Sequence, residues 1–100
     1  MPIFMLMTRM DSETLRDASG RRTRGKEWIE RVKKTCPEVK WIGHYAILGP
    51  YDFMDIYDAP SIEEAHKVSL ISRSEGAVSA ESWQALPYEQ FIGLLEEIQP

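Results

Sequence analysis

The residues most capable of chemistry lie on two short segments, residues 39–48 and 51–58. Both are rich in aromatic and branched side chains and are separated by Gly49-Pro50, a pattern typical of a β-hairpin. With the turn at these two residues, the predicted register places His44 opposite Asp55. A carboxylate beside an imidazole orients the ring and stabilises its protonated form, which suits general acid/base catalysis. We therefore interpret His44 and Asp55 as candidate catalytic residues, with a structural hydrogen bond as the alternative.

The same register pairs Ala46 with Phe53 and Ile42 with Tyr57 on the face of His44. The opposite face is more apolar, and we expect it to pack against the helices; it carries Gly43, Tyr45, Ile47, Met54 and Ile56. The face of His44 would then look into a cavity that could hold a small, partly aromatic ligand. The ligand-binding residues would be Tyr51, Asp52, Phe53 and Tyr57.

Other kinds of active site have no signal in the sequence. No segment has the spacing of a zinc site, a glycine-rich phosphate loop or a nucleophile elbow. The single cysteine, Cys36, has no second thiol for a disulfide and no neighbouring ligands at metal-binding spacing. We therefore expect neither a metal site nor a cofactor. A lone thiol also fits a reducing cytoplasm.

Size and charge narrow the class of protein further. The 100 residues, 43% of them hydrophobic, are enough for one compact domain over residues 1–100 and too few for two. A net charge of -4 opposes a phosphate backbone, so we expect no nucleic-acid partner. The basic run Arg21, Arg22, Arg24 and Lys26 is interpreted as a solvated loop and first helical turn, with a bound anionic ligand as the alternative.

The opening residues 1–7 are apolar but are followed directly by Thr8-Arg9. They have no basic lead-in and no cleavage-type tail, and they are too few to span a bilayer. We interpret them as part of a buried strand, so we expect a cytoplasmic protein without a membrane segment.

The remaining elements follow from periodicity and from end signals. Residues 3–9 form an apolar strand, and residues 23–36 have helical spacing that Pro37 ends. The stretch 11–22 holds either one helical turn around Leu15 or an irregular loop. Ser61 can cap a helix that runs to about residue 74 and closes at Gly76. Strand 77–85 follows, and Pro87 opens a helix with an apolar stripe of Tyr88, Phe91, Ile92, Leu95 and Ile98.

The element order is therefore βαββαβ with an added C-terminal helix. Connected right-handedly, two βαβ halves give an α+β, ferredoxin-like sandwich: a four-stranded antiparallel sheet with both helices on one face. The other face stays bare. A second copy packed against it would cover it, so we expect a homodimer or a higher homo-oligomer.

The hairpin carries a recognisable motif, Gly49-Pro50-Tyr51-Asp52. With its surroundings, Tyr45-Ala46-Ile47-Leu48 before it and residues 81–86 after it, the chain resembles the GYD domain family over nearly its whole length. The resemblance implies a dimeric α/β barrel and no particular reaction, because the wider barrel superfamily includes both ligand-sensing domains and cofactor-free monooxygenases and isomerases. We expect small-molecule binding in the barrel cavity; the alternative is a cofactor-independent enzyme using His44 and Asp55.

Overall fold

The computed structural model describes residues 2–99, apart from the side chain of Thr14. Its element order confirms the predicted α+β fold and adds one short helix before the first long one. The elements are β1 (Ile3–Arg9), α1 (Ser12–Arg16), α2 (Ala18–Thr35), β2 (Lys40–Ala46), β3 (Phe53–Asp58), α3 (Ile62–Ser74), β4 (Ser79–Ala85) and α4 (Tyr88–Ile98).

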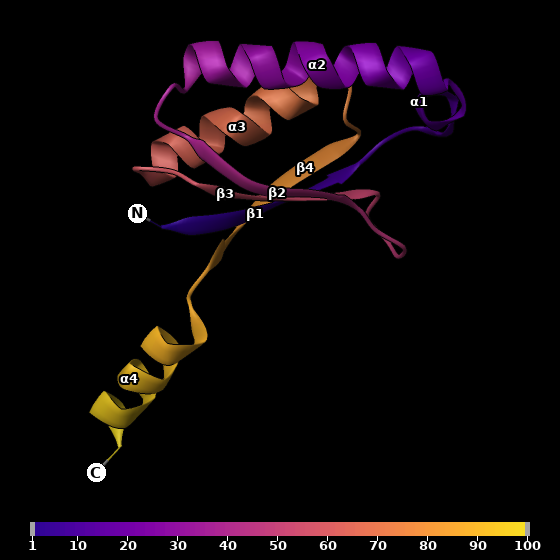
Figure 1. Ribbon diagram of the computed structural model, residues 1–100. Helices are drawn as coiled ribbons and strands as arrows, with labels where there is room; N and C mark the ends of the chain where they lie inside the picture. The colour runs from indigo at the N-terminus through magenta and orange to yellow at the C-terminus, as the bar shows by residue number, and fades with distance from the viewer. Residues whose placement is uncertain (1, 100) are drawn as a thin grey trace.

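The four strands form one antiparallel sheet in the order β2-β3-β1-β4. Helices α2 and α3 both lie over one face of it, as Figure 1 shows. The predicted pairs His44 with Asp55 and Ala46 with Phe53 are confirmed. The predicted pair of Ile42 with Tyr57 is wrong, because the register shifts between Trp41 and Gly43 and places Trp41 opposite Tyr57.

The helix ends follow local chemistry. Asp17 caps α2 by accepting a 3.0 Å hydrogen bond from the Gly20 amide, so α2 begins five residues before the predicted start at residue 23. The helical turn around Leu15 forms as α1. Ser61 caps α3 as predicted, with its Oγ accepting from the Glu64 amide at 3.2 Å. After α3, Gly76 adopts φ 109°, a conformation that favours glycine.

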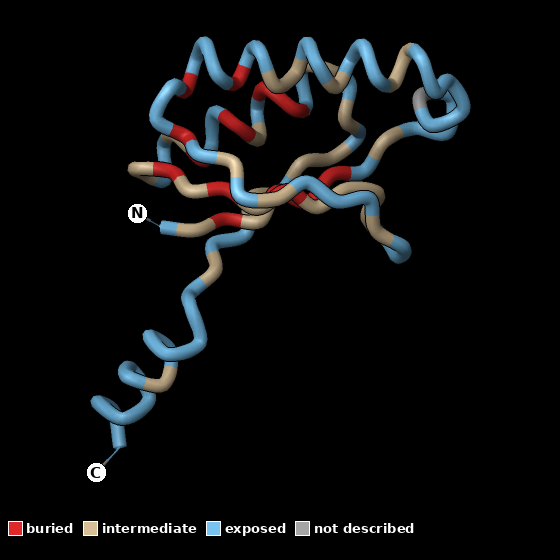
Figure 2. The backbone as a smooth tube through the Cα atoms, in the orientation of Figure 1, coloured by how far each residue is buried: buried red, intermediate tan, exposed pale blue. Residues whose placement is uncertain are grey.

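The core lies between the sheet and the two covering helices, where the buried segments of Figure 2 concentrate. Its centre is aromatic. Tyr57 is fully buried, stacks on Phe4 at 5.5 Å between ring centroids and meets Trp41 at 5.2 Å. Trp28 of α2 extends this cluster by contacting Trp41 edge-on at 5.1 Å.

The predicted assignment of the two sheet faces is wrong. The face with Asp55 and Tyr57 points toward the helices, where both residues are buried. The face with Tyr45 is open, and Tyr45 is 52% exposed. The reason is that β1 adds Phe4 and Leu6 to the first face and the register shift adds Trp41, so the predicted hairpin alone underestimates the apolar content of this face. His44 therefore does not look into a hollow between two sheets.

Helix α4 forms as predicted but stands away from the domain. β4 leads it to the side of the sheet opposite α2 and α3 (Figure 1), and no Cα atom of α4 lies within 8 Å of one in another described element. Most of its apolar stripe is exposed, with Tyr88 at 70% and Ile98 at 77%. None of the described helices is long and apolar enough to cross a membrane.

Candidate functional site

The predicted pair of His44 and Asp55 forms at the edge of the helix-covered face. The imidazole Nδ1 contacts the Asp55 Oδ1, with the carboxylate buried and the imidazole side chain 64% exposed. Burial raises the pKa of Asp55, while the hydrogen bond and charge of His44 act against that shift. The pair thus joins a buried carboxylate to an exposed imidazole.

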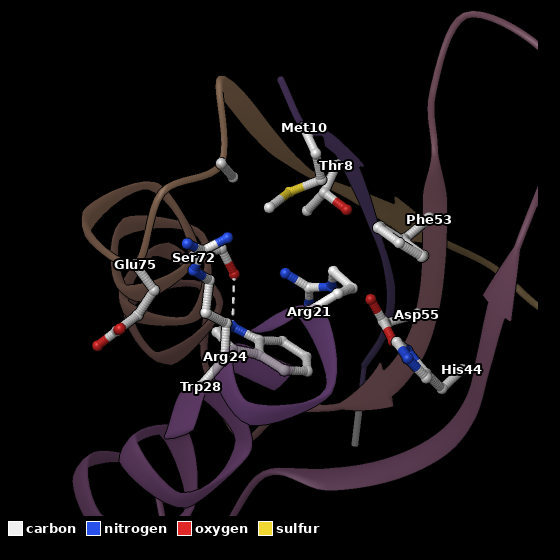
Figure 3. Close-up of a pocket in the computed structure, with 11 residues that line it drawn as sticks. Thr8, Met10, Arg21, Arg24, Trp28, His44, Phe53, Asp55, Ser72 and Glu75 are labelled. Carbon is white, nitrogen blue, oxygen red and sulfur yellow. Dashed lines mark hydrogen bonds and ion pairs between the residues drawn. The ribbon is translucent and has the colours of Figure 1, made fainter. Parts of the chain in front are cut away.

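A hollow of about 40 Å³ lies beside this pair, between the sheet, α2 and the C-terminal end of α3 (Figure 3). This volume has room for about three water molecules or for the charged group of a small ligand. Mostly polar and aromatic side chains from these elements and the loops beside them line it: Thr8, Met10, Arg21, Arg24, Trp28, His44, Phe53, Asp55, Ser72, Glu75 and Ala77.

Helix α2 supplies the positive charge of the hollow. Arg21, Arg24 and Trp28 follow one another at intervals of three and four residues, so they share one helical face. In Figure 3 both guanidinium groups lie at the hollow, Arg21 on the side of Asp55 and Arg24 on the side of Ser72. Arg21 also lies over the Phe53 ring, 5.3 Å from its centroid. The predicted solvated loop and first helical turn are therefore helical throughout, and Arg21 and Arg24 line the hollow while Arg22 and Lys26 are exposed.

The electrostatics of Arg21 reflect this position. Burial, followed by the nearby charge of Arg24, lowers the pKa of Arg21, and the Asp55 carboxylate opposes the shift. From the sequence, Arg21 and Arg24 are site residues only in the alternative of a bound anion, because a helix that begins at residue 23 does not place Arg21 on one face with Arg24 and Trp28. The Asp17 cap and the spacing to Trp28 are the signals that could have found them.

A second hollow, of about 320 Å³, shares four residues with the first: Arg21, Trp28, His44 and Asp55. The rest of its lining is mostly apolar and comes from α2 and β2: Gly25, Lys26, Ile29 and Trp41. Arg21 thus borders both a small polar hollow and a larger apolar one.

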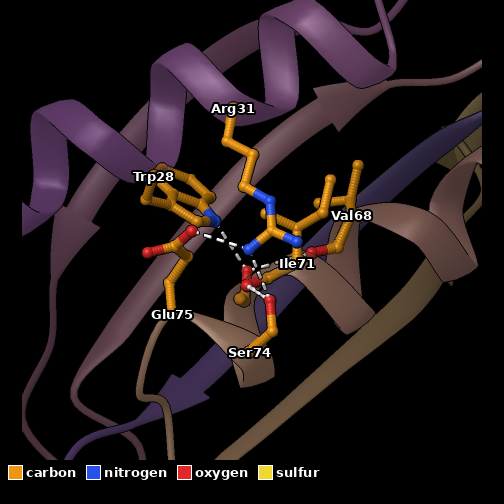
Figure 4. Close-up of polar contacts among 7 residues, drawn as sticks. Trp28, Arg31, Val68, Ile71, Ser74 and Glu75 are labelled. Carbon is orange, nitrogen blue, oxygen red and sulfur yellow. Dashed lines mark hydrogen bonds and ion pairs between the residues drawn. The ribbon is translucent and has the colours of Figure 1, made fainter.

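Polar contacts between α2 and α3 fix one wall of the site (Figure 4). The Trp28 indole donates a 2.7 Å hydrogen bond to the Ser72 Oγ, which in turn donates to the Val68 carbonyl. Arg31 donates to the Ser74 Oγ at 2.8 Å and pairs with Glu75 at 2.7 Å. The Glu75 carboxylate is therefore paired with a residue outside the hollow.

The two tyrosines of the predicted site do not join His44. Tyr57 lies in the core, where its hydroxyl contacts the Ser82 Oγ at 2.6 Å and burial raises its pKa to about 12. Tyr51 lies on the open face, donates to Glu81 at 2.8 Å and meets the Trp83 ring edge-on at 5.6 Å. Of the predicted ligand-binding residues, only Phe53 lines the hollow with the histidine and aspartate.

The hairpin motif has a structural role. Gly49 adopts φ 147°, which a side chain would strain. The Asp52 side chain accepts a 2.8 Å hydrogen bond from the Met10 amide, and its own amide donates to the Thr8 carbonyl at 2.8 Å. The motif therefore ties the end of the hairpin to the end of β1, which holds Phe53 and Asp55 at the hollow.

The chain matches the GYD domain over residues 4–95. It belongs to the GYD domain family. A relative from Thermus thermophilus, named "Glutamine synthetase and cystathionine beta-lyase binding protein", is 30% identical over 73 residues, which are 67% of this chain and 77% of the relative.

Two solved structures share the fold. MtbAldR matches with a TM-score of 0.60 at 13% identity, over 86% of this chain and 53% of its own, so this chain spans about half of it. FFRP-DM1 matches with a TM-score of 0.53 at 15% identity, over 86% of this chain and all of its own. At these identities the likeness concerns the fold alone.

The described residues offer no cluster of metal ligands. Within residues 2–99, no three His, Cys, Asp or Glu side chains come together as a metal site would require. The exclusion of nucleic acid and the cytoplasmic location stay predictions from charge and composition.

Proposed function

We propose that this GYD-family chain is a homodimeric binding protein in which two copies pack together through the open faces of their sheets. The observation that carries this proposal is the apolar character of that face, which neither α2 nor α3 covers. A twofold axis lets such a surface be covered by its own copy. The apolar residues on it are Ile3, Met5, Tyr45, Met54, Ile56 and Trp83.

Helix α4 supports a second copy as the occupant of this face. It projects on the side where that copy would lie, and its stripe has no apolar partner in its own domain. An amphipathic helix of this kind gains stability only when its apolar face is covered. In the dimer, the exposed residues of the stripe pack on the partner together with Leu94: Tyr88, Phe91, Leu95 and Ile98.

Replacing Ile56 with Lys tests the dimer. The lysine would place a charge in the centre of the sheet-to-sheet contact, so Ile56→Lys should run as a monomer where the wild type runs as a dimer in light scattering after gel filtration. Leu70→Lys is the matched control, because Leu70 is 58% exposed on α3, away from that face. A wild-type monomer at all accessible concentrations would disprove the dimer.

The partner we propose is a larger metabolic enzyme, by analogy with the name of the Thermus relative. Purified glutamine synthetase and cystathionine β-lyase from the organism that makes this chain are the two enzymes to test. Immobilised chain should bind at least one of them saturably, and an unrelated protein of similar charge should not bind. If neither enzyme binds, the enzyme-partner part of the proposal is wrong while the dimer can stand.

A second candidate, small-molecule binding with acid/base chemistry, has one observation in its favour: His44 contacts Asp55 beside a hollow. Mass spectrometry of gently purified protein, repeated after incubation, separates its two forms. A retained and unchanged compound supports binding, whereas a converted one supports catalysis. In the second case His44→Ala should stop the conversion and leave the oligomeric state unchanged.

A further inference from the structure

We propose that the hollow beside Asp55 binds a small oxyanion, a carboxylate or a phosphate, through the guanidinium groups of Arg21 and Arg24. This site goes beyond the proposed dimer and enzyme partner, and it lies on the other side of the sheet from both the open face and α4.

The acidic side chains around the hollow make their direct contacts with bases other than these two arginines, although the Asp55 carboxylate still acts on Arg21 from a distance. Asp55 is in contact with His44, and Glu75 is paired with Arg31 at 2.7 Å. Within residues 2–99, neither the Arg21 nor the Arg24 side chain forms a hydrogen bond or an ion pair. The two acidic groups of the lining are thus matched by other bases, and two positive charges remain.

The position of Arg21 makes an anion favourable. Its guanidinium is half-buried over the Phe53 ring and is repelled by Arg24, one helical turn away. A charge removed from water and placed near a like charge costs free energy unless a counter-ion offsets it. An oxyanion between the two groups would accept charge-assisted hydrogen bonds from both, in a fork geometry that suits carboxylate and phosphate alike.

The remaining walls suit a small ligand. Thr8 adds a hydroxyl group, and Trp28 and Met10 add apolar contacts that keep the local dielectric low. The volume of about 40 Å³ accommodates the charged group, and the neighbouring hollow of about 320 Å³ along Trp41 has room for an apolar remainder. The site thus fits an anionic head with or without a short hydrophobic tail.

The test titrates the full chain with sodium acetate and, separately, with sodium phosphate, at constant ionic strength, and follows amide shifts by NMR. We expect saturable shifts near Thr8, Arg21 and Phe53 with at least one probe, and the probe that saturates identifies the ligand as a carboxylate or a phosphate. Arg21→Gln and Arg24→Gln should each weaken binding about tenfold or more, as expected for loss of a charge-assisted hydrogen bond.

Arg22→Gln is the matched control. It removes the same charge from the same helix, but Arg22 is exposed and does not line the hollow, so affinity should stay within about twofold. Equal weakening by the three variants would mean diffuse attraction to a basic helix and would overturn the site, as would the absence of saturable shifts with both probes. Arg24 is exposed, so its replacement reports on the site even if Arg21→Gln folds poorly.

Discussion

The two faces of the sheet are both apolar, but only one is completed within the chain. On the covered face, Leu6, Tyr57 and Val32 are fully buried between the strands and the two helices. On the open face, Tyr45 and Trp83 remain 52% and 41% exposed, and the adjoining α4 has no neighbour. The covered face therefore holds the core and carries the candidate site at its edge, whereas the open face is the one that we propose a second copy covers.

Two neighbouring residues of β1 test this difference most strongly. Leu6 is fully buried on the covered face, so Leu6→Ala should lower the free energy of unfolding by ~2–5 kcal/mol at every protein concentration. Met5 points to the open face, so Met5→Ala should cost about 1 kcal/mol or less in dilute protein and more as concentration rises. Urea unfolding over a range of protein concentrations measures both. Similar, concentration-independent losses would mean that the chain itself covers the open face.

Much of the fold was accessible from local sequence signals. Ser61 marks the start of α3 because few residue types provide a side-chain cap. Gly76 marks the end of α3, and Gly49 the hairpin turn, because a positive φ favours glycine. These signals also placed His44 opposite Asp55, because the register of a hairpin is set at its turn.

The part of the site that could not be predicted depends on contacts between distant segments. The hairpin sequence does not reveal which of its two faces α2 covers and the apolar residues of β1 extend. The sequence-based prediction therefore places His44 and Asp55 on the wrong side of the sheet. The Asp17 cap lies within a stretch of ambiguous pattern, and the hollow of Arg21 and Arg24 exists only once α2 begins there and packs near α3. The shift at Trp41 has no local signal that we can identify.

Tyr57 on the covered face and Tyr51 on the open face allow the two faces of the sheet to be compared at alkaline pH. Burial raises the pKa of Tyr57 to about 12, whereas partly exposed Tyr51 owes its raised pKa mainly to its hydrogen bond to Glu81. Because Tyr57 keeps its proton to a higher pH in the folded chain than in the unfolded chain, its contribution to stability is fully present below about pH 10. This contribution is lost as pH rises toward about 12. Unfolding free energies between about pH 9 and pH 12 should therefore fall less steeply in Tyr57→Phe than in wild type. Tyr51→Phe is the control: because the pKa of Tyr51 is raised less, this variant should lie closer to wild type than Tyr57→Phe does, and the reverse order would contradict the burial argument.

Two tryptophans give the smallest expected effect and the sharpest comparison. Both indoles donate hydrogen bonds, Trp28 to Ser72 across 44 residues and Trp83 to Glu81 two residues away on the open face. Phenylalanine keeps an aromatic ring at either position but removes the donor. Trp28→Phe should cost about 1 kcal/mol, because it unlinks α2 from α3, and Trp83→Phe should stay within about 0.5 kcal/mol in dilute protein. If Trp83→Phe becomes the costlier change as concentration rises, a second copy buries the ring, which is 41% exposed in the described chain.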